Sequence, residues 1–211
     1  MFTGIVSAVG HITEVTGQDA NDPAAGVRLS ISAPGFLREA TRIGDSISIQ
    51  GACMTVTSMP DSQSNGVPGN MFTVDVSRES LDRTAGLDRK GPVNLEHAMR
   101  MGDTLDGHLV SGHVDGLGAV QHFAPVGESW DLRIQVPASL ARYMAYKGSI
   151  TVDGVSLTIN RVEDNEDGCV VHINLIPHTI QVTTLGQLAE GRPVNLEVDM
   201  IARYVERMMS A

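Results

Sequence analysis

Two short segments of the chain carry nucleophilic and hydroxyl side chains in the same arrangement. They are Ala52-Cys53-Met54-Thr55 and Val155-Ser156-Leu157-Thr158. In each segment a thiol or a hydroxyl stands two residues before a threonine, so both groups project from one face if the segment is a β-strand. Polar groups on such a face can hydrogen-bond a flat heterocycle. The alternative is a barrel interior that requires small residues at these positions.

Histidine is the other residue type with suitable chemistry, because it exchanges a proton near neutral pH. The seven histidines show no spacing typical of a metal site. His113 stands out because the matching position in the first half of the chain is Ile5. It can serve in catalysis or in structure, and the sequence leaves both roles open. Nucleophile-elbow, phosphate-loop and dinucleotide-binding signatures are absent from the sequence.

These segments belong to an internal repeat that runs along the whole chain. Four colinear pairs of segments match: 47–56 with 150–159, 92–96 with 193–197, 3–10 with 111–118, and 79–84 with 178–183. Their offsets stay between 99 and 108 residues, a drift that insertions in surface loops explain. Chance likeness between short apolar segments of β-proteins is the alternative, but it rarely gives four colinear matches. We therefore predict two domains, at residues 1–97 and 98–197.

The pattern within each copy predicts short strands, because residues alternate with a period of two and are rich in Val, Ile and Thr. The predicted strands are 5–12, 27–33, 46–50, 54–58 and 72–77 in the first copy, and 132–136, 149–153, 156–162 and 170–176 in the second. Gly51, between two of them, indicates a bulge or a tight bend. Pro34 and Pro137 each precede a short predicted helix, at 35–42 and 138–146. We predict an all-β fold of two tandem six-stranded Greek-key barrels.

The last segment, residues 198–211, is predicted to form a C-terminal α-helix with one apolar face. Ile201, Tyr204, Val205 and Met208 recur at the spacing of a helical stripe. Such a face needs a partner, which is either the chain's own barrel or another subunit. Because the helix follows two complete modules, we predict that it serves oligomerisation.

The overall charge argues against two classes of partner. The formal net charge is −10 at pH 7, which disfavours nucleic acid and anionic membrane surfaces. No apolar run approaches the roughly 20 residues that cross a bilayer, and the N-terminus lacks the features of a signal peptide. Cys53 and Cys169 lie far apart without a C-x-x-C pair, so neither a disulfide framework nor a zinc site is indicated. We expect a cytoplasmic protein with reduced thiols.

Six longer motifs occur in an order that resembles a known family. They are Met1-Phe2-Thr3-Gly4-Ile5-Val6, Gly51-Ala52-Cys53-Met54-Thr55-Val56, Gly107-His108-Leu109-Val110-Ser111-Gly112-His113-Val114, Tyr146-Lys147-Gly148-Ser149-Ile150, Asp153-Gly154-Val155-Ser156-Leu157-Thr158 and Leu175-Ile176-Pro177-His178-Thr179. Together they resemble the riboflavin synthases of the trimeric, alpha-subunit type. The resemblance covers essentially the whole chain.

The resemblance implies an enzyme that catalyses a dismutation. Two molecules of 6,7-dimethyl-8-ribityllumazine exchange a four-carbon unit, giving riboflavin and 5-amino-6-ribitylaminouracil, and the family uses no metal or organic cofactor. The resemblance also implies two six-stranded barrels and a homotrimer assembled through the C-terminal helix, with the active site between subunits. Association with lumazine synthase is a further partner that it suggests.

The resemblance also assigns two sets of substrate-binding residues. One lumazine would contact Gly4, Ile5, Val6, Cys53, Met54, Thr55, Asp75, Val76, Ser77, Arg78, Glu79 and Ser80. The other would contact Gly112, His113, Val114, Lys147, Ser156, Leu157, Thr158, Asn174, Leu175, Ile176, Pro177, His178 and Thr179. Candidate catalytic residues, with roles unassigned, are His113, Cys53, Ser156 and Thr158. The chain departs from the family pattern at Ser80, where threonine is expected, and in a longer loop at residues 60–70.

A non-catalytic relative is the main alternative function. Lumazine-binding fluorescent antenna proteins are similar in fold and keep a competent N-terminal site, but their second site has lost its binding residues and they catalyse no reaction. Here Ser156, Thr158, His113 and Lys147 are all present, so we favour the enzyme. A third interpretation, a structural or interaction β-protein, leaves the doubled polar segment unexplained.

Overall fold

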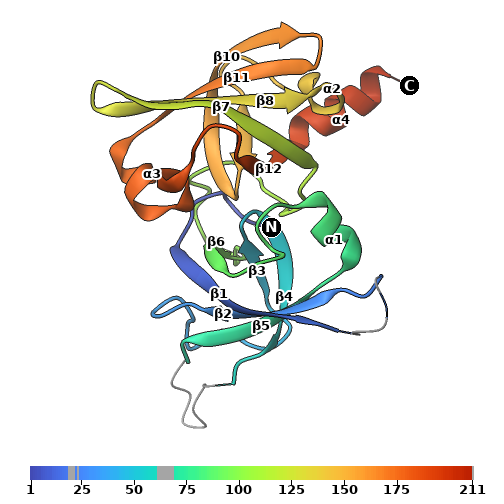
Figure 1. Ribbon diagram of the computed structural model, residues 1–211, viewed down its shortest axis with the longest axis vertical. Coiled ribbons are helices and arrows are strands. Elements are labelled where there is room, and N and C mark those ends of the chain that lie inside the picture. Colours follow the sequence, from blue (N-terminus) through green and yellow to red (C-terminus); the bar gives the residue numbers. More distant parts are fainter. Residues whose placement is uncertain (19–21, 23, 61–68, 211) are drawn as a thin grey trace.

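The computed structural model describes residues 1–18, 22, 24–60 and 69–210, and it consists of two β-barrels in tandem. Figure 1 shows the barrels stacked along the long axis of the molecule, with the first barrel at the bottom. The first barrel contains β1 (Ala8–Gly17), β2 (Val27–Ser32), β3 (Ser46–Ile49), β4 (Ala52–Ser58), β5 (Met71–Val76) and β6 (Gly91–His97). The second contains β7 (Gly116–Val126), β8 (Ser129–Pro137), β9 (Ser149–Val152), β10 (Val155–Asn165), β11 (Gly168–Leu175) and β12 (Pro193–Val198). The helices are α1 (Arg78–Arg83), α2 (Ala138–Ala141), α3 (Pro177–Val182), the 3-10 helix η1 (Thr184–Gln187) and α4 (Met200–Met209).

Both barrels close in the same strand order. Neighbouring strands run β1-β2-β5-β4-β3-β6 in the first barrel and β7-β8-β11-β10-β9-β12 in the second, and the last strand pairs with the first. Strands β3, β4 and β5 are consecutive while β2 lies beside β5, which is Greek-key order. The prediction of an all-β protein with two tandem six-stranded barrels and a C-terminal helix is confirmed.

The alternating sequence pattern fills each barrel with apolar side chains. In β5, Phe72, Val74 and Val76 are buried, whereas Thr73 and Asp75 between them are only half-buried. Burying one large apolar side chain contributes about 1.5–3 kcal/mol, and each barrel has its own cluster of such residues. The inward positions therefore serve stability, and the outward positions of the same strands are left for other roles.

The two barrels meet through a pair of hairpin turns. Gln50-Gly51 joins β3 to β4 and Asp153-Gly154 joins β9 to β10, and all four residues have positive φ, as two-residue type I′ turns require. A Cβ added to Gly51 would lie 2.8 Å from the backbone nitrogen of Gly154. The tight bend expected at Gly51 is thus one half of a contact between the barrels.

Two buried asparagines from the repeated segment 92–96 and 193–197 tie these turns together. Asn94 Nδ2 donates to the carbonyl oxygen of Asp153 at 2.8 Å, and Asn195 Nδ2 donates to the carbonyl oxygen of Gln50 at 2.9 Å. Each asparagine thus reaches from its own barrel to the turn of the other. The bonds are reciprocal, as an approximate two-fold relation between the copies requires.

The structure differs from the predicted elements in several places. The first strand begins at Ala8 rather than at residue 5, because the preceding residues leave the barrel. Residues 35–42 form turns instead of a helix, since Gly35 is left-handed with a φ of +73°. The predicted helix at 138–146 is helical only over Ala138–Ala141. Helices α1, α3 and η1 were missed because none exceeds six residues or shows a full apolar stripe.

The long loop predicted at residues 60–70 falls mainly on residues 61–68, which lie outside the described residues.

Helix α4 is held to the second barrel by its polar side. Arg203 Nη2 donates to the Asp115 carboxylate and Arg142 Nη1 donates to Glu206 Oε1, each at 2.8 Å. The apolar stripe on the helix remains between 49 and 79% exposed at Ile201, Tyr204, Val205 and Met208. Figure 1 shows the helix beside the second barrel, at the C-terminal end of the chain. Within the described part of the chain, no helix is long and apolar enough to cross a membrane.

The contact between the hairpin turns can be tested with Gly51→Ala. The new Cβ would sit in a left-handed conformation, 2.8 Å from the Gly154 nitrogen, so we expect the free energy of unfolding to fall by about 2–4 kcal/mol. Gly44→Ala is the control, because Gly44 has a φ of +95° with open space around it and should lose only about 1–2 kcal/mol. Urea denaturation measures both values. Equal losses would show that the turn contact adds nothing to stability.

Candidate active site

The two polar pairs lie on the outer faces of their barrels. On β4, Met54 points into the core, whereas Cys53 is half-buried and Thr55 is exposed. On β10, Ser156 is half-buried and Thr158 is exposed. Each pair projects from one strand face, as expected, and the interpretation as small interior residues does not hold.

We call the segment that precedes the first strand of each barrel its leading segment. Each leading segment lies across the other barrel. Ser156 N donates to the carbonyl oxygen of Gly4 at 2.8 Å, and Cys53 N donates to the carbonyl oxygen of Gly112 at 2.7 Å. Both crossing points need glycine: a Cβ on Gly4 would lie 2.6 Å from Ser156 Cβ, and one on Gly112 would lie 2.7 Å from Cys53 Cβ. Each polar pair is therefore covered by backbone from the other half of the chain.

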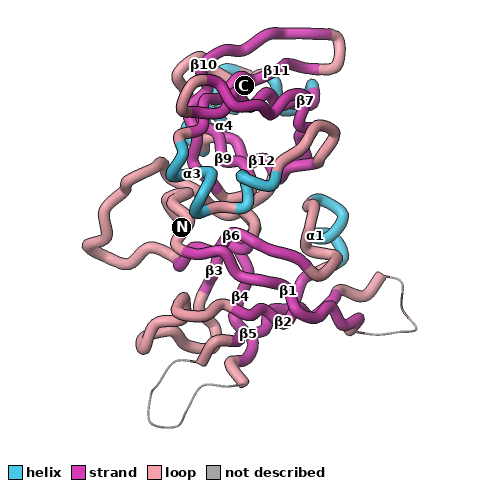
Figure 2. The backbone as a smooth tube through the Cα atoms, turned by 60° about the vertical axis from the view of Figure 1, so that its left-hand side comes forward, coloured by secondary structure: helices cyan, strands magenta, loops and turns pink. Residues whose placement is uncertain are grey.

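Within the chain, the segment before each first strand packs against the opposite barrel, whereas the resemblance grouped it with its own barrel. Val6 packs against the core of the second barrel and Val114 against the core of the first. The physical reason is an antiparallel bridge in which Phe2 N donates to Val110 O at 2.7 Å and Val110 N donates to Phe2 O at 3.0 Å. This pairing carries each leading segment past its own barrel. Figure 2 shows the chain near the N-terminus at the level where the two barrels meet.

A cavity of about 290 Å³ beside β4 brings together the first set of candidates. Its lining residues are Ala52, Cys53, Met54, Glu79, Ser80, Arg83, Thr84, Gly112, His113 and Val114. His113 is exposed and Cys53 is half-buried, so both side chains are accessible to a bound molecule. The thiol and the imidazole come from different halves of the chain and meet at this cavity.

Only part of the predicted run from Asp75 to Ser80 borders this cavity. Glu79 and Ser80 line it, whereas Val76 belongs to the barrel core. The Asp75 carboxylate accepts two hydrogen bonds from the Arg28 guanidinium, at 2.7 and 2.9 Å, and these bonds lower the pKa of Asp75. Asp75 is thus an ionised member of a surface pair.

Helix α1 explains how Glu79 and Ser80 reach the cavity. Ser77 Oγ accepts a hydrogen bond from Ser80 N at 3.1 Å, which caps the first turn. Arg78 forms an ion pair with Asp82 at 2.6 Å along the exposed side of the helix. The cap therefore starts the helix immediately after β5 and presents its first turn to the cavity.

A histidine that was not predicted as a site residue lies beside the second polar pair. His108 Nδ1 lies 2.7 Å from Ser156 Oγ, and His108 Nε2 lies 3.2 Å from Thr151 Oγ1. His108 is buried, and desolvation lowers the pKa of its imidazole. A neutral imidazole can accept the proton of the Ser156 hydroxyl. The two residues are 48 positions apart, so only the fold reveals the pair.

Lys147 is held on the same strand face as Ser156 and Thr158. Its Nζ donates to Asn160 Oδ1 at 2.9 Å and lies 5.5 Å from the centroid of the Tyr146 ring. Asn160 stands two residues after Thr158, where the pairing of β10 with β11 shifts register, and its bond to Lys147 is exposed. The ammonium group therefore extends the polar surface of β10.

The run from Asn174 to Thr179 occupies the position that corresponds to α1 in the first barrel. Leu175 is buried in the core, whereas Asn174, Ile176, Pro177 and His178 are exposed and Thr179 is half-buried. Pro177 begins α3 at its first position, which suits proline because that nitrogen needs no hydrogen-bond partner within the helix. Leu157, the remaining candidate, is half-buried against the core of the second barrel.

Two buried carboxylates hold the leading segments, and neither carboxylate was predicted from the sequence. Glu96 accepts hydrogen bonds from Thr3 and Gly4, and Glu197 accepts them from residues 111–113. Burial raises the pKa of both carboxyl groups, that of Glu197 to about 7. Both glutamates end the repeated Pro-Val-Asn-Leu-Glu segment, which is the signal that could have identified them.

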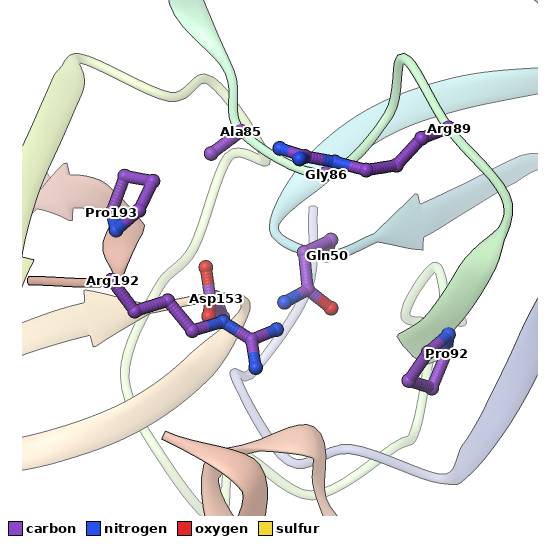
Figure 3. A pocket seen from close by; sticks show the side chains of 8 residues that line it. All are labelled: Gln50, Ala85, Gly86, Arg89, Pro92, Asp153, Arg192 and Pro193. Atoms are coloured by element: carbon purple, nitrogen blue, oxygen red, sulfur yellow. The ribbon is translucent and has the colours of Figure 1, made fainter. Parts of the chain in front are cut away.

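A separate cavity of about 360 Å³ lies between the barrels and contains none of the predicted site residues. Figure 3 shows its lining, to which the two hairpin turns contribute Gln50 and Asp153. Asn195 N donates to Asp153 Oδ1 at 2.8 Å, and complete burial raises the pKa of Asp153 to about 7. Gln50 and Asp153 are bonded within the junction, while Arg89 forms an ion pair with Asp88 and Arg192 Nη1 donates to the Gln187 carbonyl oxygen. We assign this cavity to the connection between the barrels.

The arrangement supports proton exchange and the binding of a polar heterocycle. A thiol and an accessible imidazole line the cavity beside β4, and on the second barrel a hydroxyl lies within hydrogen-bond distance of a buried imidazole. Backbone groups of the leading segments add hydrogen-bond partners beside both polar pairs. Among the described residues, no group of three His, Cys, Asp or Glu side chains is arranged to hold a metal ion.

Comparisons with known proteins agree with this architecture. The lumazine binding domain model matches the chain twice, at residues 3–98 and 111–199. A riboflavin synthase from Mycobacterium tuberculosis is 46% identical over 212 residues, covering 99% of this chain and 98% of that protein. Riboflavin synthases from Photobacterium phosphoreum and Brucella abortus are 38% and 36% identical, each over 99% of this chain and over 89% and 98% of their own lengths.

Solved structures show the same fold. The crystal structure of LumP complexed with riboflavin has a TM-score of 0.77 and 24% sequence identity, covering 94% of this chain and 99% of that chain. LumP complexed with 6,7-dimethyl-8-(1'-D-ribityl) lumazine has a TM-score of 0.75 at the same identity and coverage. The doubled domain and the full-length similarity lead to one conclusion. The chain belongs to the riboflavin synthase family and contains two lumazine binding domains.

Proposed function

We propose that this enzyme catalyses the dismutation of 6,7-dimethyl-8-ribityllumazine. Two molecules exchange a four-carbon unit, which gives riboflavin and 5-amino-6-ribitylaminouracil in the last step of riboflavin biosynthesis. The observation that carries the proposal is the presence of two like binding domains, each with a polar pair on the outer face of the equivalent strand. Two like sites suit a transferase reaction between two like molecules, in which positioning is a large part of catalysis.

The proposed substrate contacts follow the crossing of the leading segments. One lumazine would contact Cys53 together with Gly112, His113 and Val114, because these residues share a cavity. The other would contact Ser156 together with residues 4–6, because Ser156 N binds the Gly4 carbonyl. The remaining candidate residues would contact the lumazine bound to their own barrel. We also propose domains at residues 1–97 and 98–197, in which the leading segment of each domain contributes to the binding site on the opposite barrel.

Different acid–base groups face the two proposed substrates. His113 and Cys53 are accessible in the first cavity, and the Ser156 hydroxyl is paired with the buried His108. We infer that one pair removes a proton from the 7-methyl group of its lumazine. The other pair would assist the capture of the acceptor carbon of the second lumazine by water or a side chain. The antenna alternative is not favoured, since both barrels keep their polar pair.

We also propose that the enzyme is a homotrimer joined through α4. The support is the orientation of this helix: its charged side is bonded to its own barrel, and its apolar stripe faces solvent. An apolar stripe of this kind needs a partner, and other copies of the chain offer identical stripes. A cytoplasmic location and association with lumazine synthase are proposed on the sequence resemblance alone.

The proposed function predicts both turnover and a binding ratio. Purified protein mixed with 6,7-dimethyl-8-ribityllumazine should form riboflavin without any added metal or cofactor, as followed by absorbance. Equilibrium dialysis with a non-reacting lumazine analogue should reveal two bound molecules per chain. Tight binding without turnover would instead establish an antenna protein, and one ligand per chain would contradict the two-site reaction.

Removal of residues 200–211 tests the role of α4. We expect folded barrels with little activity, because the proposed active site lies between subunits. Circular dichroism, sedimentation velocity and turnover measure fold, assembly and activity. Met208→Glu places a charge on the exposed stripe and should act in the same direction, whereas Arg207→Gln on the same helix should not. A fully active monomer would refute the proposal.

The His108–Ser156 pair predicts a pH dependence. Because burial holds the pKa of His108 below its ordinary value, the imidazole stays neutral at pH 7, and activity should fall only as the pH drops below about 6.5. His108→Asn should lower kcat by about 10²-fold or more and remove this acidic limb. The control is His122→Asn, because His122 is a half-exposed surface histidine. An unchanged profile in His108→Asn would exclude the pair from proton transfer.

A further inference from the structure

Glu197 directs its whole carboxylate at one short stretch of backbone. Glu197 Oε1 accepts a hydrogen bond from Ser111 N at 2.6 Å, and Oε2 accepts from Gly112 N at 2.9 Å and from His113 N at 3.0 Å. The side chain is on β12, and the residue is only 3% exposed. Hydrogen bonds to an ionised acceptor are about twice as strong as neutral ones. Three such bonds fix the path of this segment.

Glu96 makes the equivalent contacts in the other half of the chain. Its Oε1 accepts from Thr3 N and Thr3 Oγ1, both at 2.7 Å, and its Oε2 accepts from Gly4 N at 3.0 Å. Glu96 is on β6 and is 5% exposed. The same side chain thus performs the same bonding twice, at positions related by the internal repeat.

The barrels themselves do not need a carboxylate at these positions. Removing an ionised carboxylate from water costs several kcal/mol, and its hydrogen bonds must offset that cost. Here the compensating bonds go to the leading segments and not to the barrel strands. The glutamates therefore stabilise the position of the leading segments and not the barrel strands that carry them.

Each held segment completes the polar surface of the opposite barrel. Glu197 bonds the backbone of Gly112 and His113, and these residues line the cavity that contains Cys53. Glu96 bonds Gly4 N, while the carbonyl oxygen of Gly4 accepts from Ser156 N. A displacement of either segment would move backbone and side chains away from the polar pair that they cover.

We propose that Glu96 and Glu197 are positioning residues for the reaction, each fixing the leading segment that completes the substrate site of the opposite barrel. The proposal rests on the function proposed above. Neither carboxylate needs to touch substrate: Glu197 acts through the backbone of residues 111–113, and Glu96 acts through that of residues 3 and 4. Loss of one carboxylate should therefore damage one site and spare the other.

The test compares Glu197→Gln and Glu96→Gln with Glu128→Gln, a substitution at an exposed residue in the β7–β8 turn. Backbone hydrogen–deuterium exchange is measured for the segments 1–6 and 109–114. Lumazine binding is followed by titration with a non-reacting analogue, and turnover is separated into kcat and KM. Thr3→Val is added so that the test does not depend on the folding of variants that lack a buried carboxylate. It removes the 2.7 Å bond to Glu96 and the 3.1 Å bond that Thr3 Oγ1 accepts from Ile5 N, and it keeps the side-chain shape.

The two main variants should give opposite patterns. Glu197→Gln should speed exchange in 109–114 and weaken one of the two lumazine sites about tenfold, with 1–6 unchanged. Glu96→Gln should do the reverse, Thr3→Val should resemble it more weakly, and Glu128→Gln should match the original protein. Turnover should fall in both main variants, because the reaction needs both sites.

Other outcomes would overturn the proposal. Equal loosening of both segments in either variant would indicate a general role in folding, and unchanged turnover despite a loosened segment would exclude positioning. If the unmodified protein fails to convert lumazine, the proposed function fails by itself. The exchange measurements would still decide whether the carboxylates hold the segments.

Discussion

The structure depends on the exchange of leading segments between the two barrels. Phe2 and Val110 pair through their backbones, and from there Gly4 reaches Ser156 while Gly112 reaches Cys53. A closed barrel has no free strand edge, so a neighbouring segment can attach only where strands begin and end. The exchanged segments use the first residues of β4 and β10, which directly follow the hairpin turns at the junction. The binding surfaces and the contact between the barrels are thus parts of one arrangement.

This exchange links stability to function. Each polar pair is on one barrel, but the backbone that covers it comes from the other half of the chain. The reciprocal bonds of Asn94 and Asn195 hold the two hairpin turns at the same junction. A change that separates the barrels would therefore open both sites at once. Such coupling explains why polar groups are buried here despite the cost of removing them from water, since their bonds fix the relative position of the two halves.

Much of the fold could be predicted from the sequence, because the repeat and the period-two pattern are local signals. The shared strand face of Cys53 and Thr55, and of Ser156 and Thr158, followed from the same pattern, but the pattern left open whether that face points into the barrel or outward. The exchange could not be predicted, since nothing in the order of residues indicates which barrel the segment before Ala8 will cover. The His108–Ser156 pair was missed for a related reason: its members are far apart in sequence, and only closure of the second barrel brings them together. Glu96 and Glu197 were visible as repeated residues, but their partners were not.

The duplication preserves the frame and changes the chemistry. Gly4 and Gly112 make the same backbone contact, and Glu96 and Glu197 hold the same type of segment. The polar side chains differ: a thiol and an accessible imidazole line the cavity beside β4, and on the second barrel a hydroxyl lies within hydrogen-bond distance of a buried imidazole. A reaction between two identical molecules requires that they be bound alike and treated differently. In the proposed reaction, the equal frames would satisfy the first requirement, and the unequal acid–base groups would satisfy the second. The asymmetry of two copies can therefore define which substrate donates and which accepts.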